Sequence, residues 1–137
     1  MKYIKRLTVI IVFIVMFCSI NTFAGLIINI GDYSLTSGET HKSNKATLQN
    51  DINSFWYTRY ILPTSATKEK VSVYRYDGWW AVETYIAGAT EEIDSQGQYY
   101  TRITPTSTIN EGTSVGFEMK NTGNRSYDVT SGKMYEN

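Results

Sequence analysis

The chain has 137 residues, of which 42% are hydrophobic and 14% aromatic, and its 13 basic residues balance its 13 acidic ones. This length suits one compact domain rather than two. Without a basic excess there is no electrostatic case for binding nucleic acid or an anionic membrane surface. We therefore exclude both as default partners.

Residues 1–24 are predicted to be a signal peptide that is cleaved after Ala24. Three positive charges precede an apolar run over residues 7–17, and Thr22-Phe23-Ala24 supplies the small residues that signal peptidase accepts. The run is shorter than the ~20 apolar residues of a membrane-spanning helix. An uncleaved membrane anchor and lipid attachment at Cys18 are the alternatives. We expect a secreted, extracellular protein that meets the membrane only during export.

The segment that remains after cleavage is predicted to be all-β. It carries ten basic and thirteen acidic residues, and it lacks Cys18, the only cysteine, so packing alone must hold the fold. Abundant Tyr, Thr, Val and Ile favour strands, with Gly, Asn, Ser and Asp between them as turn formers. We expect a small antiparallel β-sandwich or barrel of about six to seven strands.

In chain order, residues 25–50 are predicted to be a flexible N-terminal segment, and residues 51–137 a single β domain. The stretch 36–50 is polar and has no periodicity, although 26–35 could form one further strand. Alternating apolar and polar residues bounded by turn formers indicate the other strands. These are expected at residues 55–62, 71–76, 79–87, 99–104, 114–120 and 125–130.

A hairpin is predicted around Asp77-Gly78, because Asp-Gly tolerates the positive φ angles of a two-residue type I′ turn. This turn would place Tyr76 opposite Trp79. Since side chains alternate across a sheet, the pairs sort onto two faces. One face would carry the apolar residues Val71, Val73, Val82 and Ile86, with Arg75 beside Trp80. The other would carry Tyr74, Tyr76, Trp79 and Tyr85.

A second hairpin is predicted at residues 121–124, between an alternating strand and its return strand. The apolar side chains expected to point inward are Val115, Phe117 and Met119 on the first strand and Tyr127 and Val129 on the second.

Residues suited to catalysis are few after the signal peptide. His41, the only histidine, lies in a polar stretch and is interpreted as a solvated loop residue. Carboxylates can run glycoside hydrolysis without histidine, and Glu83, Glu91, Glu92, Asp94 and Glu118 are candidates by residue type only. The turn at 91–94 matches no EF-hand loop, and no ligand cluster suits zinc. We predict no catalytic residue, no metal, no cofactor and no enzymatic activity.

The face formed by Tyr74, Tyr76, Trp79 and Tyr85 is the one feature with functional content. Exposed aromatic rings can stack on the apolar faces of sugars or anchor a protein partner at low entropic cost. Burial of the same rings between two sheets is the competing interpretation. We name these four residues as the candidate ligand-binding site, for a cell-wall glycan or a protein.

Several short motifs resemble a family of uncharacterised small secreted proteins of Gram-positive bacteria, with a faint similarity to lactococcin-972-like peptides. They are Tyr57-Thr58-Arg59-Tyr60, Tyr99-Tyr100 and the tail over 112–132, although Lys133-Met134-Tyr135 stands where that family has a Trp. The resemblance implies secretion and a small β-rich fold. We expect a non-enzymatic binding protein of the bacterial cell surface or medium. A bacteriocin-like toxin is the alternative, and a small carboxylate-dependent hydrolase is a third hypothesis.

Overall fold

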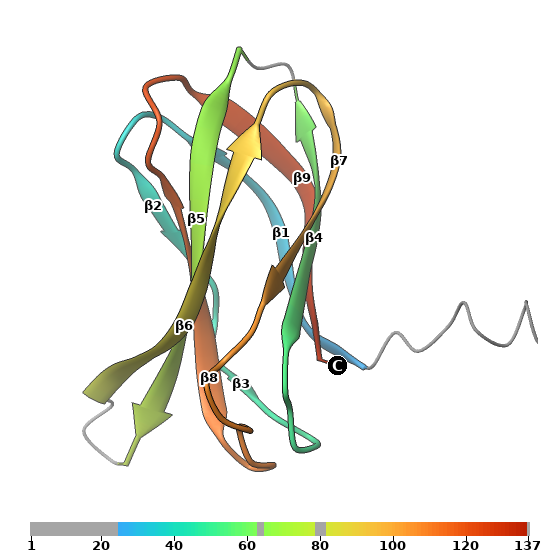
Figure 1. Ribbon diagram of the computed structural model, residues 1–137, viewed down its shortest axis with the longest axis vertical. Coiled ribbons are helices and arrows are strands. Elements are labelled where there is room, and N and C mark those ends of the chain that lie inside the picture. The colour runs from blue at the N-terminus through green and yellow to red at the C-terminus, as the bar shows by residue number, and fades with distance from the viewer. Residues whose placement is uncertain (1–24, 63–64, 79–81, 137) are drawn as a thin grey trace, which may run out of the picture.

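The computed structural model describes residues 25–62, 65–78 and 82–136, and within them the protein is a sandwich of two antiparallel β-sheets (Figure 1). One sheet has the strand order β1-β9-β4-β7, and the other has the order β2-β8-β5-β6 with the short β3 also paired to β8. No helix occurs in these ranges. The strands are β1 (Leu26–Leu35), β2 (Thr40–Lys42), β3 (Ala46–Thr47), β4 (Phe55–Leu62), β5 (Thr67–Asp77), β6 (Val82–Ile93), β7 (Gly97–Ile103), β8 (Ser114–Asn121) and β9 (Tyr127–Glu136).

The prediction of an all-β fold is confirmed, and of its two alternatives, sandwich and barrel, the structure is the sandwich. The strand expected at residues 55–62 coincides with β4. The regular alternation of buried and half-buried residues along β4 explains that agreement, because a strand with one face on the core repeats every two residues. The structure has more strands than the six or seven expected. The two short strands β2 and β3 were missed, since neither is long enough to show an alternating pattern.

The domain begins earlier than residue 51. β1 pairs along its length with β9, and β2 and β3 pair with β8, so the stretch 25–50 contributes to both sheets. Tyr33, Leu35 and Leu48 from this stretch are buried in the core. The predicted boundary, which set residues 25–50 apart as a flexible segment, is therefore placed too late. The predicted signal peptide, residues 1–24, lies outside the described residues.

The hydrophobic core fills the space between the two sheets. Its buried members include Leu48, Ile52, Phe55, Tyr57, Ile61, Val71, Val73, Ile93, Ile103, Phe117, Met119, Val129 and Met134. Phe55 of one sheet packs edge-to-face against Phe117 of the other, with ring centroids 5.7 Å apart. Such aromatic pairs contribute about 0.5–1.5 kcal/mol beyond the area they bury. Val115, Phe117, Met119, Tyr127 and Val129 all point inward, as the sequence predicted.

The second predicted hairpin is wrong in its pairing. β8 pairs with β2, β3 and β5, whereas β9 pairs with β1 and β4, so the chain crosses from one sheet to the other between them. The turn residues at 122–124 are present, and Thr122 and Gly123 hydrogen-bond to Lys68 and Asn121. A tight approach explains the glycine, because a Cβ at Gly123 would stand 2.3 Å from Oγ1 of Thr67.

The register of the β5–β6 hairpin also differs from the prediction. Tyr76 lies opposite Glu83, and Asp77 opposite Val82, so the connection is longer than the two-residue turn expected at Asp77-Gly78. Gly78 does adopt a positive φ of 68°. Residues 79–81 lie outside the described residues. The tip of this hairpin extends beyond the other sheet (Figure 1), and Val82, expected in the core, is 59% exposed there.

Candidate functional site

The tyrosine face, which we define as Tyr74, Tyr76 and Tyr85, lies on the outer side of the five-stranded sheet. Tyr74 pairs directly with Tyr85 across β5 and β6, and their rings meet edge-to-face with centroids 5.8 Å apart. Tyr76 stands two residues further along β5 on the same side. Three of the four predicted site residues are thus brought together, and the fourth, Trp79, lies outside the described residues.

Two glycines let the tyrosine rings lie close to the sheet. A Cβ at Gly116 on β8 would stand 2.7 Å from Cε2 of Tyr76, so the Tyr76 ring lies across this glycine. A Cβ at Gly88 on β6 would come within 2.9 Å of the Tyr85 hydroxyl. Tyr85 is nevertheless 52% exposed, while Tyr74 and Tyr76 are half-buried. The rings form a low aromatic surface open to solvent, and the interpretation that this face is buried between the sheets is wrong.

Charged side chains surround the tyrosine face. The Tyr76 hydroxyl donates to a carboxylate oxygen of Glu83 at 3.2 Å, and the Lys45 ammonium lies 4.0 Å from the centre of the Tyr76 ring. Burial, with the nearby carboxylate of Glu83, raises the pKa of Tyr76. Burial likewise raises the pKa of Tyr74, helped by Glu118. Both hydroxyls therefore stay protonated at neutral pH and can donate hydrogen bonds.

Glu83 and Glu118, two of the carboxylates considered for hydrolysis, flank one lysine. Nζ of Lys42 lies 3.4 Å from Glu83 and 3.6 Å from Glu118, and Glu83 raises the pKa of this lysine. A glycosidase needs one carboxyl that keeps a proton for the leaving group. Here one ammonium pairs with both carboxylates.

The other candidates do not gather into a site. Glu92 forms an exposed ion pair with Lys68 at 2.7 Å, and Glu91 accepts a hydrogen bond from the hydroxyl of Thr101. Within the described ranges, no three His, Cys, Asp or Glu residues are placed to hold a metal ion. No helix in the described part of the chain is long and apolar enough to span a membrane.

His41 is not the solvated loop residue that its sequence suggested. It lies in β2 and is half-buried, and its ring stacks on that of Tyr33 with centroids 4.4 Å apart and planes 3° from parallel. Burial lowers its pKa. Its ring therefore takes part in packing against β1.

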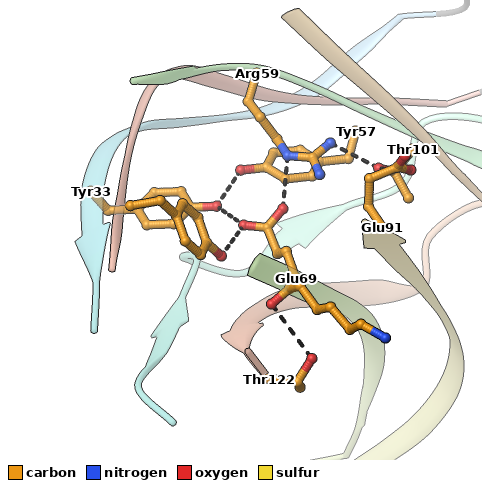
Figure 2. A network of polar contacts seen from close by, with 9 residues as sticks. Tyr33, Tyr57, Arg59, Glu69, Glu91, Thr101 and Thr122 are labelled. Carbon is orange, nitrogen blue, oxygen red and sulfur yellow. Dashed lines mark hydrogen bonds and ion pairs between the residues drawn. The ribbon is translucent and has the colours of Figure 1, made fainter. Parts of the chain in front are cut away.

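A buried polar cluster, missed in the sequence, joins the two sheets through Glu69 of β5 (Figure 2). One carboxylate oxygen accepts from the hydroxyls of Tyr33, at 2.9 Å, and Tyr127, at 2.6 Å. The other lies 2.7 Å from Nε of Arg59. Neither the Arg59 nor the Glu69 side chain is exposed. Strict alternation along β4 could have placed Arg59 inside, because it stands between Tyr57 and Ile61 on the inward side.

The surroundings of Arg59 complete this cluster. Its Nη1 donates to the Thr101 hydroxyl at 2.8 Å, and its guanidinium lies 4.6 Å from the centre of the Tyr57 ring. Nη2 of Arg59 has no hydrogen-bond partner among the described residues. Nε of Arg59 is close enough to Glu69 for an ion pair, but the two groups are not aligned for a hydrogen bond. Because solvent does not reach the cluster, we assign it to the core and not to a reaction site.

One hollow on the surface of the described residues, about 460 Å³, is lined by 66–68, Glu92 and 122–124 beside the paired Lys68 and Glu92, and it has no aromatic wall. Another hollow, about 360 Å³, is lined by Thr58, Gln98, Tyr100 and Tyr135 on the outer side of the four-stranded sheet. The sequence did not predict a site at these residues, because they come from three strands whose pairing it does not reveal.

Comparisons with known proteins support the fold. No family model matches the sequence, and no curated protein is detectably similar to it. Among solved structures, the chain is similar to carbohydrate-binding module CBM6cm-2 of a Cellvibrio mixtus lichenase, crystallised with cellotriose. The TM-score is 0.52, the identity is 7%, and the match covers 82% of this chain and 99% of that one.

Two further structures match with a similar score. A non-crystalline cellulose-specific module, CBM28, gives a TM-score of 0.51 at 8% identity, covering 77% of this chain and 73% of that one. A chain of the infectious bursal disease virus Gx strain gives 0.53 at 14% identity over 79% of this chain. This chain spans 30% of the virus chain and 18% of an arabinofuranosidase chain that it also matches. At these identities the likeness establishes a shared β-sandwich fold.

Proposed function

We propose that this chain is a non-enzymatic glycan-binding module that uses the tyrosine face on its five-stranded sheet. The observation that carries the proposal is the low, solvent-open arrangement of Tyr74, Tyr76 and Tyr85, held against the strands by Gly116 and Gly88. A rigid strand scaffold fixes these rings before any ligand arrives, which limits the entropy lost on binding.

The chemistry of this face fits a sugar. Pyranose rings present C–H groups that pack on aromatic faces, and their hydroxyls need hydrogen-bond partners around the rim. The Tyr76 ring offers an aromatic face for the C–H groups. Beside it, Lys42, Glu83 and Glu118 offer hydrogen-bond donors and acceptors for the hydroxyls. The Lys45 ammonium that lies over the Tyr76 ring belongs to an exposed side chain, which a sugar would displace.

The matched modules give the proposal a first probe. One of them was crystallised with cellotriose, and another is described as specific for non-crystalline cellulose. A short neutral glucan is therefore the first ligand to test against this chain, followed by a panel of neutral oligosaccharides and purified bacterial cell wall. No described residue cluster favours the toxin or hydrolase hypothesis over binding. Export by residues 1–24 and action outside the cell remain part of the proposal.

Binding is tested by titration calorimetry with the exported chain, residues 25–137. Replacing the exposed ring in Tyr85→Ala should weaken binding by about tenfold, which corresponds to ~1.4 kcal/mol. Val82→Ala is the matched control, because Val82 lies three residues before Tyr85 on β6 and is similarly exposed, but is outside the tyrosine face. No binding to any neutral glycan, or equal loss in both variants, would overturn the proposed site.

A further inference from the structure

The outer side of the four-stranded sheet carries a second aromatic surface, opposite the tyrosine face in the sandwich. Trp56, Thr58 and Tyr60 alternate along β4 with the buried residues, so all three side chains point outward. The small Thr58 between two large neighbours leaves a gap in this surface. That gap is the hollow of about 360 Å³.

The neighbouring strands supply the walls of the hollow. Thr58 pairs with Tyr100 of β7 on one side and with Lys133 of β9 on the other. Two residues along the same strands, Tyr135 pairs with Trp56. With neighbouring strands about 4.8 Å apart, Tyr100 and Lys133 flank a floor about 10 Å wide. Tyr100 is 57% exposed. The volume lies at the lower end of the roughly 300–1,000 Å³ range of small-molecule sites.

Two cations near this hollow, on strand positions that pair with Trp56 and Thr58, have no acidic partner among the described residues. Arg102 pairs with Trp56 across β4 and β7, and its guanidinium lies 5.7 Å from the centre of the Trp56 ring. Lys133 stands beside Thr58. Within the described part of the chain, no carboxylate lies within 4.0 Å of either cation. On the tyrosine face, by contrast, Lys42 is paired with two glutamates.

We propose that this hollow is a second glycan site, selective for an acidic sugar that carries a carboxylate, such as a hexuronic acid residue. The sugar ring would pack between Tyr100 and Tyr135, with the Thr58 hydroxyl and the Gln98 amide below and beside it. Its carboxylate would pair with Lys133 or with Arg102, which is already held against Trp56. The inference extends the proposed function to a second face, and one chain could then hold two glycan strands on opposite sides.

The test uses a short oligogalacturonate and its methyl ester, which keeps the ring shape and removes the charge. We expect the acid to bind residues 25–137 and the ester to bind much more weakly. In Arg102→Gln/Lys133→Gln the affinity for the acid should fall by about ten- to a hundredfold, as for loss of charged hydrogen bonds. Tyr100→Ala should weaken binding of both ligands.

The tyrosine-face variant Tyr85→Ala separates this proposal from the proposed function. It should leave oligogalacturonate binding unchanged, while Tyr100→Ala leaves neutral-glycan binding at the tyrosine face unchanged. Equal affinity for acid and ester would overturn acid selectivity. Loss of oligogalacturonate binding in Tyr85→Ala, or no binding by the wild-type chain, would overturn the second site, whatever the result with neutral glycans.

Discussion

The carboxylate of Glu69 and the guanidinium of Arg59 lie 2.7 Å apart with neither side chain exposed, and they link the two sheets of the sandwich. A buried pair of this kind costs desolvation on both sides, and its charges compensate only while both are present. Tyr33 and Tyr127 supply two further hydrogen bonds to Glu69, which help to offset that cost.

Removing one member of this pair should destabilise the fold strongly. Glu69→Gln or Arg59→Met is expected to lower the free energy of unfolding by about 3–5 kcal/mol, because the remaining partner is left buried without compensation. Urea denaturation measures the loss. The double variant Arg59→Met/Glu69→Leu should lose less than the sum of the single variants. The exposed pair Lys68–Glu92 is the control, where Lys68→Gln should cost no more than about 1 kcal/mol. Additive single losses would contradict a coupled pair.

The tyrosines around Glu69 should make the fold sensitive to alkali. Burial and the Glu69 carboxylate raise the pKa values of Tyr33, Tyr57 and Tyr127 above the ordinary 10.0. The folded state thus holds these protons more tightly than the unfolded state. The contribution of these tyrosines to the free energy of unfolding is complete below pH 10 and is lost as the pH rises above that value. Above pH 10, each group makes the free energy of unfolding fall by about 1.4 kcal/mol per pH unit, which is the slope measured. Tyr127→Phe should reduce this slope, whereas the exposed-ring variant Tyr100→Phe should leave it unchanged.

His41 should confer a separate sensitivity to mild acid. Its pKa is lowered by burial from the ordinary 6.5, so the unfolded state takes up the proton first. The contribution of His41 to the free energy of unfolding is therefore complete above pH 6.5 and declines as the pH falls through that value. In His41→Phe, which keeps a ring over Tyr33, thermal unfolding should not change between about pH 7.5 and 5.5. A hydrogen bond from the Thr36 backbone lowers the pKa of Glu39 from 4.5, so protonation of Glu39 affects stability only at lower pH. An identical decline in His41→Phe would assign the effect to other groups.

Gly116→Ala tests the tyrosine face without deleting a ring. The new Cβ would stand 2.7 Å from the Tyr76 ring, which must tilt away from the strand. We expect neutral-glycan affinity to fall by about tenfold while the melting temperature changes little. Ser114→Ala, two residues earlier on β8, is the control and should bind as the wild type does. Unchanged affinity in Gly116→Ala would show that the position of Tyr76 does not matter for binding.

The tyrosine face was predicted from the sequence although the hairpin register was wrong. Near the turn, the true pairing is displaced by four residues from the predicted one, since Tyr74 lies opposite Tyr85 rather than residue 81. Farther from the turn, a register shift between Val73 and Tyr74 raises the displacement to five residues, with Val73 opposite Ala87. The even displacement near the turn keeps the side chains there on their predicted faces of the sheet, because the strand repeats every two residues. The grouping of Tyr74, Tyr76 and Tyr85 on one side therefore survived the error. The predicted burial of Val82 was wrong, because the hairpin tip has no opposing sheet to cover it (Figure 1).

Contacts between distant strands could not be predicted in this way. A turn at residues 122–124 fits a hairpin as well as it fits a crossing between sheets, and only the positions of β1 and β4 beside β9 decide the matter. The buried cluster at Glu69 and the hollow at Thr58 each gather residues from three or more strands. Alternation places each residue on a face, but which strands become neighbours depends on packing of the whole domain.

The place of β9 between β1 and β4 also governs the order in which the domain can form. Until the chain is complete to Glu136, the first strand has no partner and its sheet is divided in two. Pairings between such distant segments are slow to form, because loop closure must be achieved before any contact is gained. A nascent chain that lacks β9 should therefore stay open and susceptible to proteases.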